Sequence, residues 1–233
     1  MKKIIIIPAY NEEASICRTV RELMEKVPEF DYVVINDCSK DDTLRICREN
    51  GFNVIDLPVN LGIGGAVQTG YRYAAANGYE CAVQVDGDGQ HDTAFLRDMA
   101  RLLEDEDLDM VIGSRFIENQ GFRSSRLRRV GIRFFSFLIK IMTGQTITDP
   151  TSGLRMVGSR VLLMFADEYP RDYPEPESTL KAIRSGCAVK EIPVVMRERT
   201  GGVSSISMKK SVYYMVKVTL AMIFECFRRS DAV

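Results

Sequence analysis

The first half of this 233-residue chain alternates short runs of branched apolar residues with longer helical patterns. Each apolar run is nearly continuous, which is typical of strands buried on both faces of a parallel sheet. The intervening helices then cover the two faces, so the pattern predicts an α/β fold with a mostly parallel, Rossmann-like sheet. The expected strands are 4–7, 32–35, 53–55, 82–85 and 110–112, and the expected helices are about 13–26, 41–49, 63–76 and 93–104.

Composition excludes several classes of protein. Hydrophobic residues make up 45% of the chain and charged residues 27%, which is ordinary for a globular domain. The formal net charge of −1 provides no global field for nucleic acid, so no nucleic-acid partner is expected. Six scattered cysteines and the single histidine, His91, argue against a zinc site and predict free thiols in a reducing cytosol. No stretch of about 18 uncharged apolar residues is present, so no membrane-spanning helix is expected.

Two acids follow the fourth expected strand. Asp86 and Asp88 stand one residue apart, with a glycine between them, and Gln90 follows. Alternate side chains of a strand share a face, so both carboxylates are expected to point at one spot beyond the strand end. Oxygen ligands at the carboxyl end of a sheet strand suit a hard divalent cation that carries phosphates. The alternative is an ordinary turn between a strand and a helix.

Polar residues also follow the first and second expected strands. Because the carboxyl ends of parallel strands meet at one edge of the sheet, all three clusters are expected to share a rim. Each cluster alone could instead cap a helix, as Ser39 or Asp41 would do well. The glycine-rich segment 60–66 either lets the backbone approach a phosphate or allows close helix packing. The residues concerned are Pro8, Tyr10, Asn11 and Glu12 after the first strand, and Asn36, Asp37, Ser39 and Asp41 after the second.

Basic residues border two strongly apolar segments in the second half of the chain. Five arginines lie in the eleven residues from Arg123 to Arg133, in an expected polar loop that leads into the apolar run 134–142. A basic loop beside an apolar helix suits an amphiphilic anion such as a lipid phosphate at a membrane surface. The segment 207–229 repeats this pattern and is expected to form an interfacial helix, with a packed core helix as the alternative.

Six motifs, in this order and spacing, resemble those of family 2 glycosyltransferases, most closely the dolichol- or polyprenyl-phosphate mannose synthase branch. They are Pro-Ala-Tyr-Asn-Glu-Glu (8–13), Asn-Asp-Cys-Ser-Lys-Asp-Asp-Thr (36–43), Asn-Leu-Gly (60–62), Asp-Gly-Asp-Gly-Gln (86–90), Gly-Ser-Arg-Phe (113–116) and Asp-Pro-Thr-Ser-Gly-Leu-Arg (149–155). The resemblance covers about residues 3–205 and implies a GT-A fold that uses Mg²⁺ or Mn²⁺ and inverts the anomeric centre. It also implies a GT-A domain at 1–205 and an amphipathic helix at 206–233. Within the domain, about 1–115 would bind the nucleotide sugar and 116–205 the acceptor.

The resemblance implies roles for individual residues. The nucleotide sugar would be bound by Pro8, Tyr10, Glu12, Asp37, Asp86 and Gln90. The metal would be held by Asp86, Asp88 and Gln90. The catalytic residues would be Asp88, Arg115, Arg129 and Arg199. The acceptor phosphate would be contacted by Arg126, Arg128, Arg133 and Ser204. Two positions depart from the pattern of the branch: Ser205 replaces a lysine, and Arg133 replaces a small hydroxyl residue.

The implied activity is transfer of a sugar from a UDP- or GDP-sugar to a polyprenyl or dolichyl phosphate. The enzyme would lie on the cytoplasmic face of a membrane and contact either the membrane surface or a separate small membrane protein. A lipid phosphate is already an anion at neutral pH, so it needs arginines rather than a general base.

One other acceptor remains an alternative, whereas two rival classes of protein are not favoured, because Pro-Ala-Tyr-Asn-Glu (8–12) follows the first strand and Asp86 and Asp88 are both present. A saccharide hydroxyl, as in polysaccharide synthesis, would want a carboxylate base such as Glu175 or Glu177, whose other role is N-terminal helix charge. A sugar-1-phosphate nucleotidyltransferase would want a basic, glycine-rich loop after its first strand. A non-catalytic nucleotide-sugar-binding scaffold would show a broken metal site.

Overall fold

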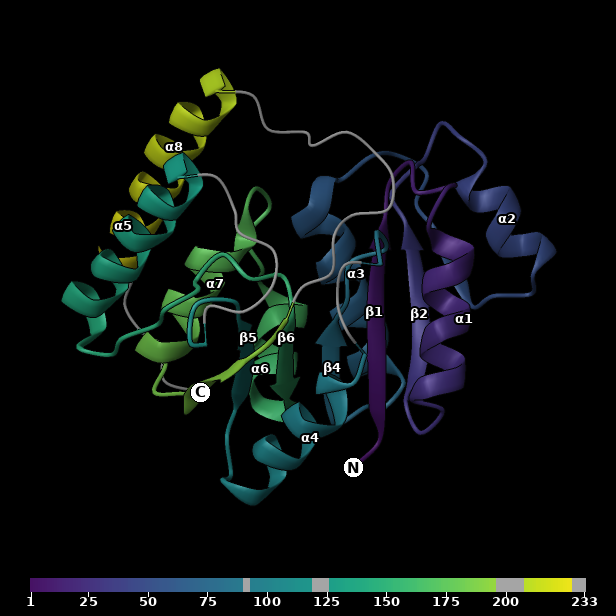
Figure 1. Cartoon of the computed structure of the whole chain (residues 1–233), viewed down its shortest axis with the longest axis horizontal. Helices are drawn as coiled ribbons and strands as arrows, with labels where there is room; N and C mark the ends of the chain where they lie inside the picture. Colours follow the sequence, from purple (N-terminus) through teal and green to yellow (C-terminus); the bar gives the residue numbers. More distant parts are fainter. Residues whose placement is uncertain (90–92, 119–125, 196–207, 228–233) are drawn as a thin grey trace.

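A computed structural model of the chain describes residues 1–89, 93–118, 126–195 and 208–227, without the side chains of 126–128 and 208–212 (Figure 1). Within these residues, seven strands form one sheet in the order β3-β2-β1-β4-β6-β5-β7. Helices cover both faces of this sheet, so the α/β fold expected from the sequence is confirmed. The strands are β1 (Lys3–Ala9), β2 (Asp31–Asn36), β3 (Val54–Asp56), β4 (Cys81–Gln84), β5 (Met110–Ser114), β6 (Arg155–Gly158) and β7 (Val189–Pro193).

The sheet is parallel except for β6, which pairs antiparallel with both β4 and β5. Its first residue, Arg155, therefore lies opposite Gln84 at the end of β4 and beside Ile112 of β5. The segment that precedes β6 is thereby placed at the carboxyl ends of β4 and β5. This reversed strand brings residues 149–154 to the edge where ligands bind in such sheets.

The helices form two layers around a strand core that is buried on both sides. Ile4 and Ile6 of β1 face one apolar cluster with α3, α6 and α7, while Ile5 and Ile7 face a second cluster with α1 and α4. All four isoleucines are at most 1% exposed, which explains why the strand reads as a continuous apolar run. The helices are α1 (Ile16–Lys26), α2 (Thr43–Glu49), α3 (Gly62–Ala76), α4 (Phe95–Asp105), α5 (Arg126–Thr143), α6 (Ser159–Asp167), α7 (Pro174–Arg184) and α8 (Met208–Phe227).

The expected polar loop before residue 134 is wrong in its second half, because α5 begins at Arg126. Ile132, Phe135 and Ile139 are at most 4% exposed and recur at helical spacing, so burial of this stripe favours the longer helix. The arginines from 126 onward are thus carried on a rigid helix. Arg129 is half-buried and Arg133 is exposed.

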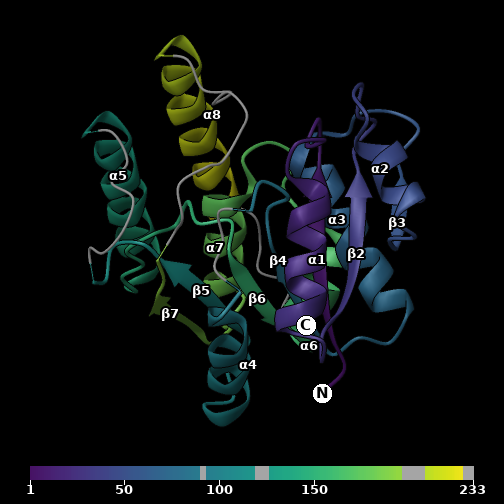
Figure 2. The ribbon, with the colours of Figure 1, turned by 45° about the vertical axis from the view of Figure 1, so that its right-hand side comes forward.

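The C-terminal helix α8 is both packed and exposed, so neither of the two expected roles describes it alone. Val218 is 2% exposed and Met222 is fully buried, and Tyr214 packs against Phe135 of α5 with ring centroids 5.4 Å apart. Figures 1 and 2 both show α5 and α8 side by side at one end of the molecule. In the part of the chain that the structure describes, no helix combines the length and apolar character needed to cross a bilayer.

Candidate active site

The acidic turn after β4 forms one wall of the candidate site. β4 ends at Gln84, one residue before the expected end, so Asp86 and Asp88 are positioned by the turn rather than by strand alternation. The Gln84 amide donates to Asp86 Oδ1 at 3.3 Å, and the Thr19 hydroxyl of α1 donates to the carbonyl of Gly87 at 3.2 Å. Gly89 adopts φ +73°, a left-handed conformation that glycine favours, directly over α1. These contacts hold two half-buried carboxylates at the carboxyl edge of the sheet.

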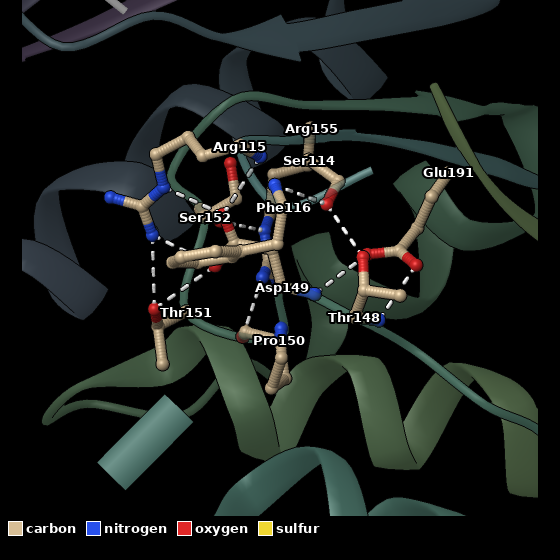
Figure 3. A network of polar contacts seen from close by, with 10 residues as sticks. All are labelled: Ser114, Arg115, Phe116, Thr148, Asp149, Pro150, Thr151, Ser152, Arg155 and Glu191. Carbon is tan, nitrogen blue, oxygen red and sulfur yellow. Dashed lines mark hydrogen bonds and ion pairs between the residues drawn. The ribbon is translucent and has the colours of Figure 1, made fainter. Parts of the chain in front are cut away.

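A bidentate ion pair forms the opposite wall (Figure 3). Arg115, directly after β5, donates from Nε to Asp149 Oδ2 at 2.6 Å and from Nη2 to Asp149 Oδ1 at 2.8 Å. The backbone N–H of Arg115 and the Thr151 hydroxyl complete the cluster. Burial opposes the charge on Arg115, but the hydrogen bonds and charge of Asp149 raise its pKa, so the guanidinium stays ionised.

Gly153, in the loop before β6, lies next to Asp86 of the acidic turn. A Cβ atom at this position would lie 3.0 Å from Asp86 Oδ2, so the glycine lets the loop before β6 approach the Asp86 carboxylate closely. Glu175 at the start of α7 belongs to the same charged group. Burial raises the pKa of its carboxyl, Arg155 and Arg115 oppose that shift, and the charge of Asp86 adds to it. The structure therefore brings Asp86, Arg115, Asp149 and Glu175 together.

The acidic turn has the donor chemistry that a hard cation needs. Asp86 and Asp88 supply carboxylate oxygens, the ligands that such a cation prefers, and two protein ligands leave coordination positions for phosphate oxygens. Among the described residues, no group of three or more histidine, cysteine, aspartate or glutamate side chains is placed to hold a metal ion. Of the three residues expected to hold Mg²⁺ or Mn²⁺, Asp86 and Asp88 lie in this turn, and Gln90 lies outside the described residues.

The polar residues after β1 and β2 are largely engaged with one another. Asn11, in a left-handed conformation, accepts from the Lys40 N–H at 2.8 Å, and its own N–H donates to the Ser39 hydroxyl at 3.0 Å. The Glu12 N–H donates to the Thr43 hydroxyl at 2.8 Å. These bonds lock the two loops into one rim. Tyr10 stays 43% exposed on this rim, and Pro8 is buried within β1.

Asp37 has a structural contact that the sequence did not reveal. Its two carboxylate oxygens accept the N–H groups of Leu61 and Gly62 at 2.7 and 2.9 Å, at the start of α3. Burial raises the pKa of Asp37, and these two hydrogen bonds oppose that shift.

The glycines of the segment 60–66 allow close packing of α3. A Cβ at Gly64 would lie 2.1 Å from the carbonyl oxygen of Pro170, so the packing alternative is supported.

The remaining arginines and the C-terminal motif are placed less completely. Arg129 and Arg133 lie on α5, whereas the side chains of Arg126 and Arg128 are not described. Arg199, Ser204 and Ser205 lie outside the described residues. The assignment of these residues to an acceptor phosphate stays a prediction.

Three important residues were not assigned a role from the sequence. Asp149 and Arg155 lay inside a motif, and only the structure shows that Asp149 binds Arg115. Arg155 is fully buried and donates to the carbonyls of Ser152 and Glu175 at 2.9 Å, which ties the loop before β6 to α7. Glu191 is an acid within the short strand β7, and this charge inside a strand is the sequence signal of its role.

The fold and the site define the class of protein. A mostly parallel sheet with one reversed strand, and an acidic turn facing an arginine at its carboxyl edge, is the arrangement of a GT-A glycosyltransferase. A family model described as Glycosyl transferase family 2 matches residues 4–163. The chain belongs to this family.

Curated relatives span most of this chain and most of their own length. The chain is 32% identical to an undecaprenyl-phosphate mannosyltransferase of Micrococcus luteus, over 89% of this chain and 88% of the relative. It is 28% identical to a polyprenol monophosphomannose synthase of Mycolicibacterium smegmatis, over 93% of this chain and 85% of the relative. It is 29% identical to a UDP-N-acetylglucosamine–dolichyl-phosphate N-acetylglucosaminyltransferase of Methanococcus voltae, over 82% of this chain and 83% of the relative. The expected branch of the family is thereby confirmed.

Solved structures support the fold. Glucosyl-3-phosphoglycerate synthase from Mycobacterium tuberculosis, in complex with Mg²⁺ and uridine diphosphate, superposes with a TM-score of 0.75. The match covers 100% of this chain and 82% of that chain at 20% identity. A complex of the same enzyme with Mn²⁺ and UDP-glucose gives a TM-score of 0.74 at 19% identity, over 100% and 81%. At this level of identity the likeness establishes the GT-A fold alone.

Proposed function

We propose that this glycosyltransferase moves a sugar, with inversion, from a UDP- or GDP-sugar to a polyprenyl or dolichyl phosphate. Residues of about 1–115 bind the donor and 116–205 the acceptor. The observation that carries the proposal is the pair of walls described above. An acidic turn suited to a metal diphosphate faces Arg115, whose charge is maintained by Asp149. The names of the curated relatives, which act on lipid phosphates, support the same acceptor class.

The donor lies along the carboxyl edge of β1, β2 and β4 in this proposal. The nucleotide pocket is lined by Pro8, Tyr10, Glu12 and Asp37. The residues that would hold Mg²⁺ or Mn²⁺ for the diphosphate are Asp86, Asp88 and Gln90. A cation held by these residues would supply positive charge to the leaving diphosphate. Asp88 fixes the position of the diphosphate, so that the sugar presents its anomeric carbon toward Arg115.

The acceptor phosphate lies on the arginine side of the site. A guanidinium offers phosphate paired N–H donors, so Arg129 and Arg199 hold and orient the attacking oxygen without removing a proton from it. Arg115, whose Nε and Nη2 atoms bind Asp149, contributes its positive charge to the same position. Arg126, Arg128, Arg133 and Ser204 provide the entry to this position. The attacking oxygen forms a bond to the anomeric carbon as the bond to the diphosphate breaks on the opposite face.

A cavity beside Arg115 suits the apolar part of the acceptor rather than its phosphate, because two acids in its wall, Asp98 and Glu118, repel an anion. It has a volume of about 270 Å³ and combines the guanidinium with apolar and acidic neighbours. Apolar side chains supply one part of its wall, which suits the first carbons of a lipid chain. The lining residues are Phe95, Asp98, Arg115, Glu118, Ile192, Pro193, Val194 and Val195.

Membrane attachment is proposed to use the exposed apolar stripes of α5 and α8, here called the α5–α8 face. Phe224 and Phe227 are 67% and 81% exposed, and Val130 and Ile141 are 66% and 65% exposed. Apolar residues gathered on adjacent helices are typical of a lipid or partner surface. Lys217 is bound to Asp172 and so contributes less to lipid headgroups than the sequence suggested. The protein would lie peripherally on the cytoplasmic face of the membrane.

One observation favours a second acceptor class. Glu175 lies close enough to Asp86 and Arg115 for their charges to act on it, and its raised pKa suits proton abstraction from a saccharide hydroxyl. In that case Glu175→Gln would abolish transfer. With a lipid phosphate acceptor, no base is needed, and the same variant would retain transfer.

The experiment is a transfer assay with a panel of UDP- and GDP-sugars and Mn²⁺. Undecaprenyl phosphate in detergent is compared with soluble saccharides as acceptors, and donor binding is followed in parallel by thermal shift. We expect a glycosylated lipid phosphate with at least one donor that stabilises the protein. Transfer only to saccharides, or donor binding without any transfer, would contradict the proposal.

A further inference from the structure

Glu191 lies at one end of a hydrogen-bond network that has Arg115 at its other end (Figure 3). It belongs to β7, where it pairs in register with Ile112 of β5. Its Oε2 atom accepts the Thr148 N–H at 2.7 Å, and its Oε1 atom accepts the Asp149 N–H at 2.8 Å and the Thr148 hydroxyl at 3.1 Å. One carboxylate therefore receives three donors from two consecutive residues.

The carboxylate gives these hydrogen bonds a single direction. When Glu191 is ionised, its carboxylate only accepts, so the Thr148 hydroxyl directs its proton toward Glu191. The Ser114 hydroxyl, 2.6 Å from the Thr148 hydroxyl, must then donate to it. The Ser114 oxygen is left to accept the N–H of Phe116 at 3.3 Å. The resulting chain fixes the residues on both sides of Arg115.

A second connection runs through Asp149. The backbone N–H of Asp149 is bound to Glu191, while its carboxylate binds both the side chain and the backbone N–H of Arg115. The Glu191 carboxylate thus restrains the anchor of Arg115 as well as its flanking residues. Burial raises the pKa of Glu191, and its three hydrogen bonds with Thr148 and Asp149 oppose that shift.

We propose that Glu191 is a positioning residue for Arg115, which it orients through Thr148 and Asp149 without touching substrate. This inference deepens the proposed function, in which the positive charge of Arg115 lies on the acceptor side of the site. The positioning role predicts an effect on acceptor use and not on donor binding. Loss of the Glu191 carboxylate should disturb acceptor use and leave the donor wall at Asp86 and Asp88 intact.

The test compares Glu191→Gln with Glu106→Gln. The glutamine keeps the shape of Glu191 but turns one accepting oxygen into a donor, which opposes the donors from Thr148 and Asp149. Glu106 is a matched control, because its carboxylate binds the neighbouring Lys190 of β7 at the surface and is 44% exposed. The first measurement is solvent exchange of the Arg115 Nε–H by NMR, on the protein without substrates. The second is steady-state kinetics with undecaprenyl phosphate and the nucleotide sugar that the wild-type protein uses.

We expect Glu191→Gln to accelerate Arg115 Nε–H exchange and to lower kcat/KM for the acceptor by about tenfold, the loss of one well-formed hydrogen bond. The KM of the donor should change by less than about twofold, because the donor wall is untouched. Glu106→Gln should match the wild-type protein in both measurements. A Glu191→Gln protein that behaves like Glu106→Gln would overturn the proposal.

A second pair of variants covers the case in which Glu191→Gln does not fold. Thr148→Val keeps the shape of the side chain and removes the bridging hydroxyl, whereas Thr148→Ser retains it. We expect the valine variant to lose acceptor use and the serine variant to restore it. Equal activity of the two would count against the proposal. If the wild-type protein does not use a lipid phosphate at all, the proposed function fails, but faster Arg115 exchange in Glu191→Gln would still support the positioning role.

Discussion

Tyr173 and Tyr214 pack edge to face, with ring centroids 4.6 Å apart, and so join the start of α7 to the middle of α8. Tyr173 adopts a left-handed conformation with φ 52°, directly before Pro174, where α7 begins. An ion pair between Asp172 and Lys217, 2.5 Å long, reinforces the same junction. Because Glu175 follows two residues later, α8 supports the backbone next to the candidate site.

This junction predicts that the two neighbouring tyrosines of α8 differ in their contribution to stability. Tyr214→Ala should lower the free energy of unfolding by about 2–4 kcal/mol, because it removes ring contacts with both Tyr173 and Phe135. Tyr213→Ala should cost less than about 1 kcal/mol, since that ring is 60% exposed. Urea unfolding followed by circular dichroism measures both. Equal effects would show that α8 is not packed as described.

A second prediction separates membrane binding from folding. Deletion of α8 is unsuitable, because it would uncover the buried Val218 and Met222. Phe224→Ser and Phe227→Ser remove exposed rings from the α5–α8 face, and each should weaken binding to anionic liposomes by about 1.5–3 kcal/mol.

Sedimentation with liposomes measures this loss of affinity. Met24→Ser, on α1 and 51% exposed, is the control for an exposed apolar residue elsewhere. Unchanged sedimentation of both phenylalanine variants would rule out this face as the lipid contact. Binding that depends on another protein and not on lipid charge would assign the face to a protein partner.

A third prediction concerns the acidic turn. Asp88→Asn should remove most transfer activity and the thermal shift that Mn²⁺ and donor produce together, because a neutral amide binds a hard cation weakly. The melting temperature without ligands should change little, since Asp88 is half-buried in a turn outside the core clusters.

Asp105→Asn, at the exposed end of α4, serves as the control and should keep both properties. Addition of EDTA to the wild-type protein should reproduce the loss of activity. Full turnover in excess EDTA would refute a metal-dependent mechanism.

A fourth prediction follows from the raised pKa of Glu191. Its folded-state pKa lies above the ordinary value of 4.5, so the native protein binds this proton more tightly than the unfolded chain. The resulting stability is fully present below 4.5 and is lost as the pH rises through the folded-state pKa. The stability of the wild-type protein relative to Glu191→Gln should therefore fall with rising pH and then level off. Urea unfolding of both proteins between about pH 4 and 8 tests the sign, and a rising difference would contradict it.

The positions of several elements were predictable from the sequence because a local pattern determines them. The isoleucine run of β1 and the apolar spacing of α1 and α4 depend on burial within one element, so their positions were predictable. The start of α5 was not, because burial of Ile132 and Phe135 outweighs the polar character of the residues before 134. The difference is one of tertiary packing.

The site shows the same division. Asp86, Asp88 and Arg115 follow strands, so their common edge could be inferred from the topology of a parallel sheet. Asp149 and Glu191 act through contacts with partners 34 and 42 residues away in the chain. No spacing rule predicts such pairs, because β6 and β7 bring them together only in the completed sheet.

The reversed strand β6 has a consequence for the order in which the protein is completed during synthesis. β4 and β5 are consecutive in the chain, yet the sheet separates them by β6, which ends at Gly158. Until that residue has left the ribosome, the exposed backbone of β4 has no strand beside it on that edge and is open to pairing with another chain. Strand pairing across this interval also requires closure of a long loop, which slows folding. A nascent chain paused near residue 115 should therefore need a chaperone more than one paused after residue 158.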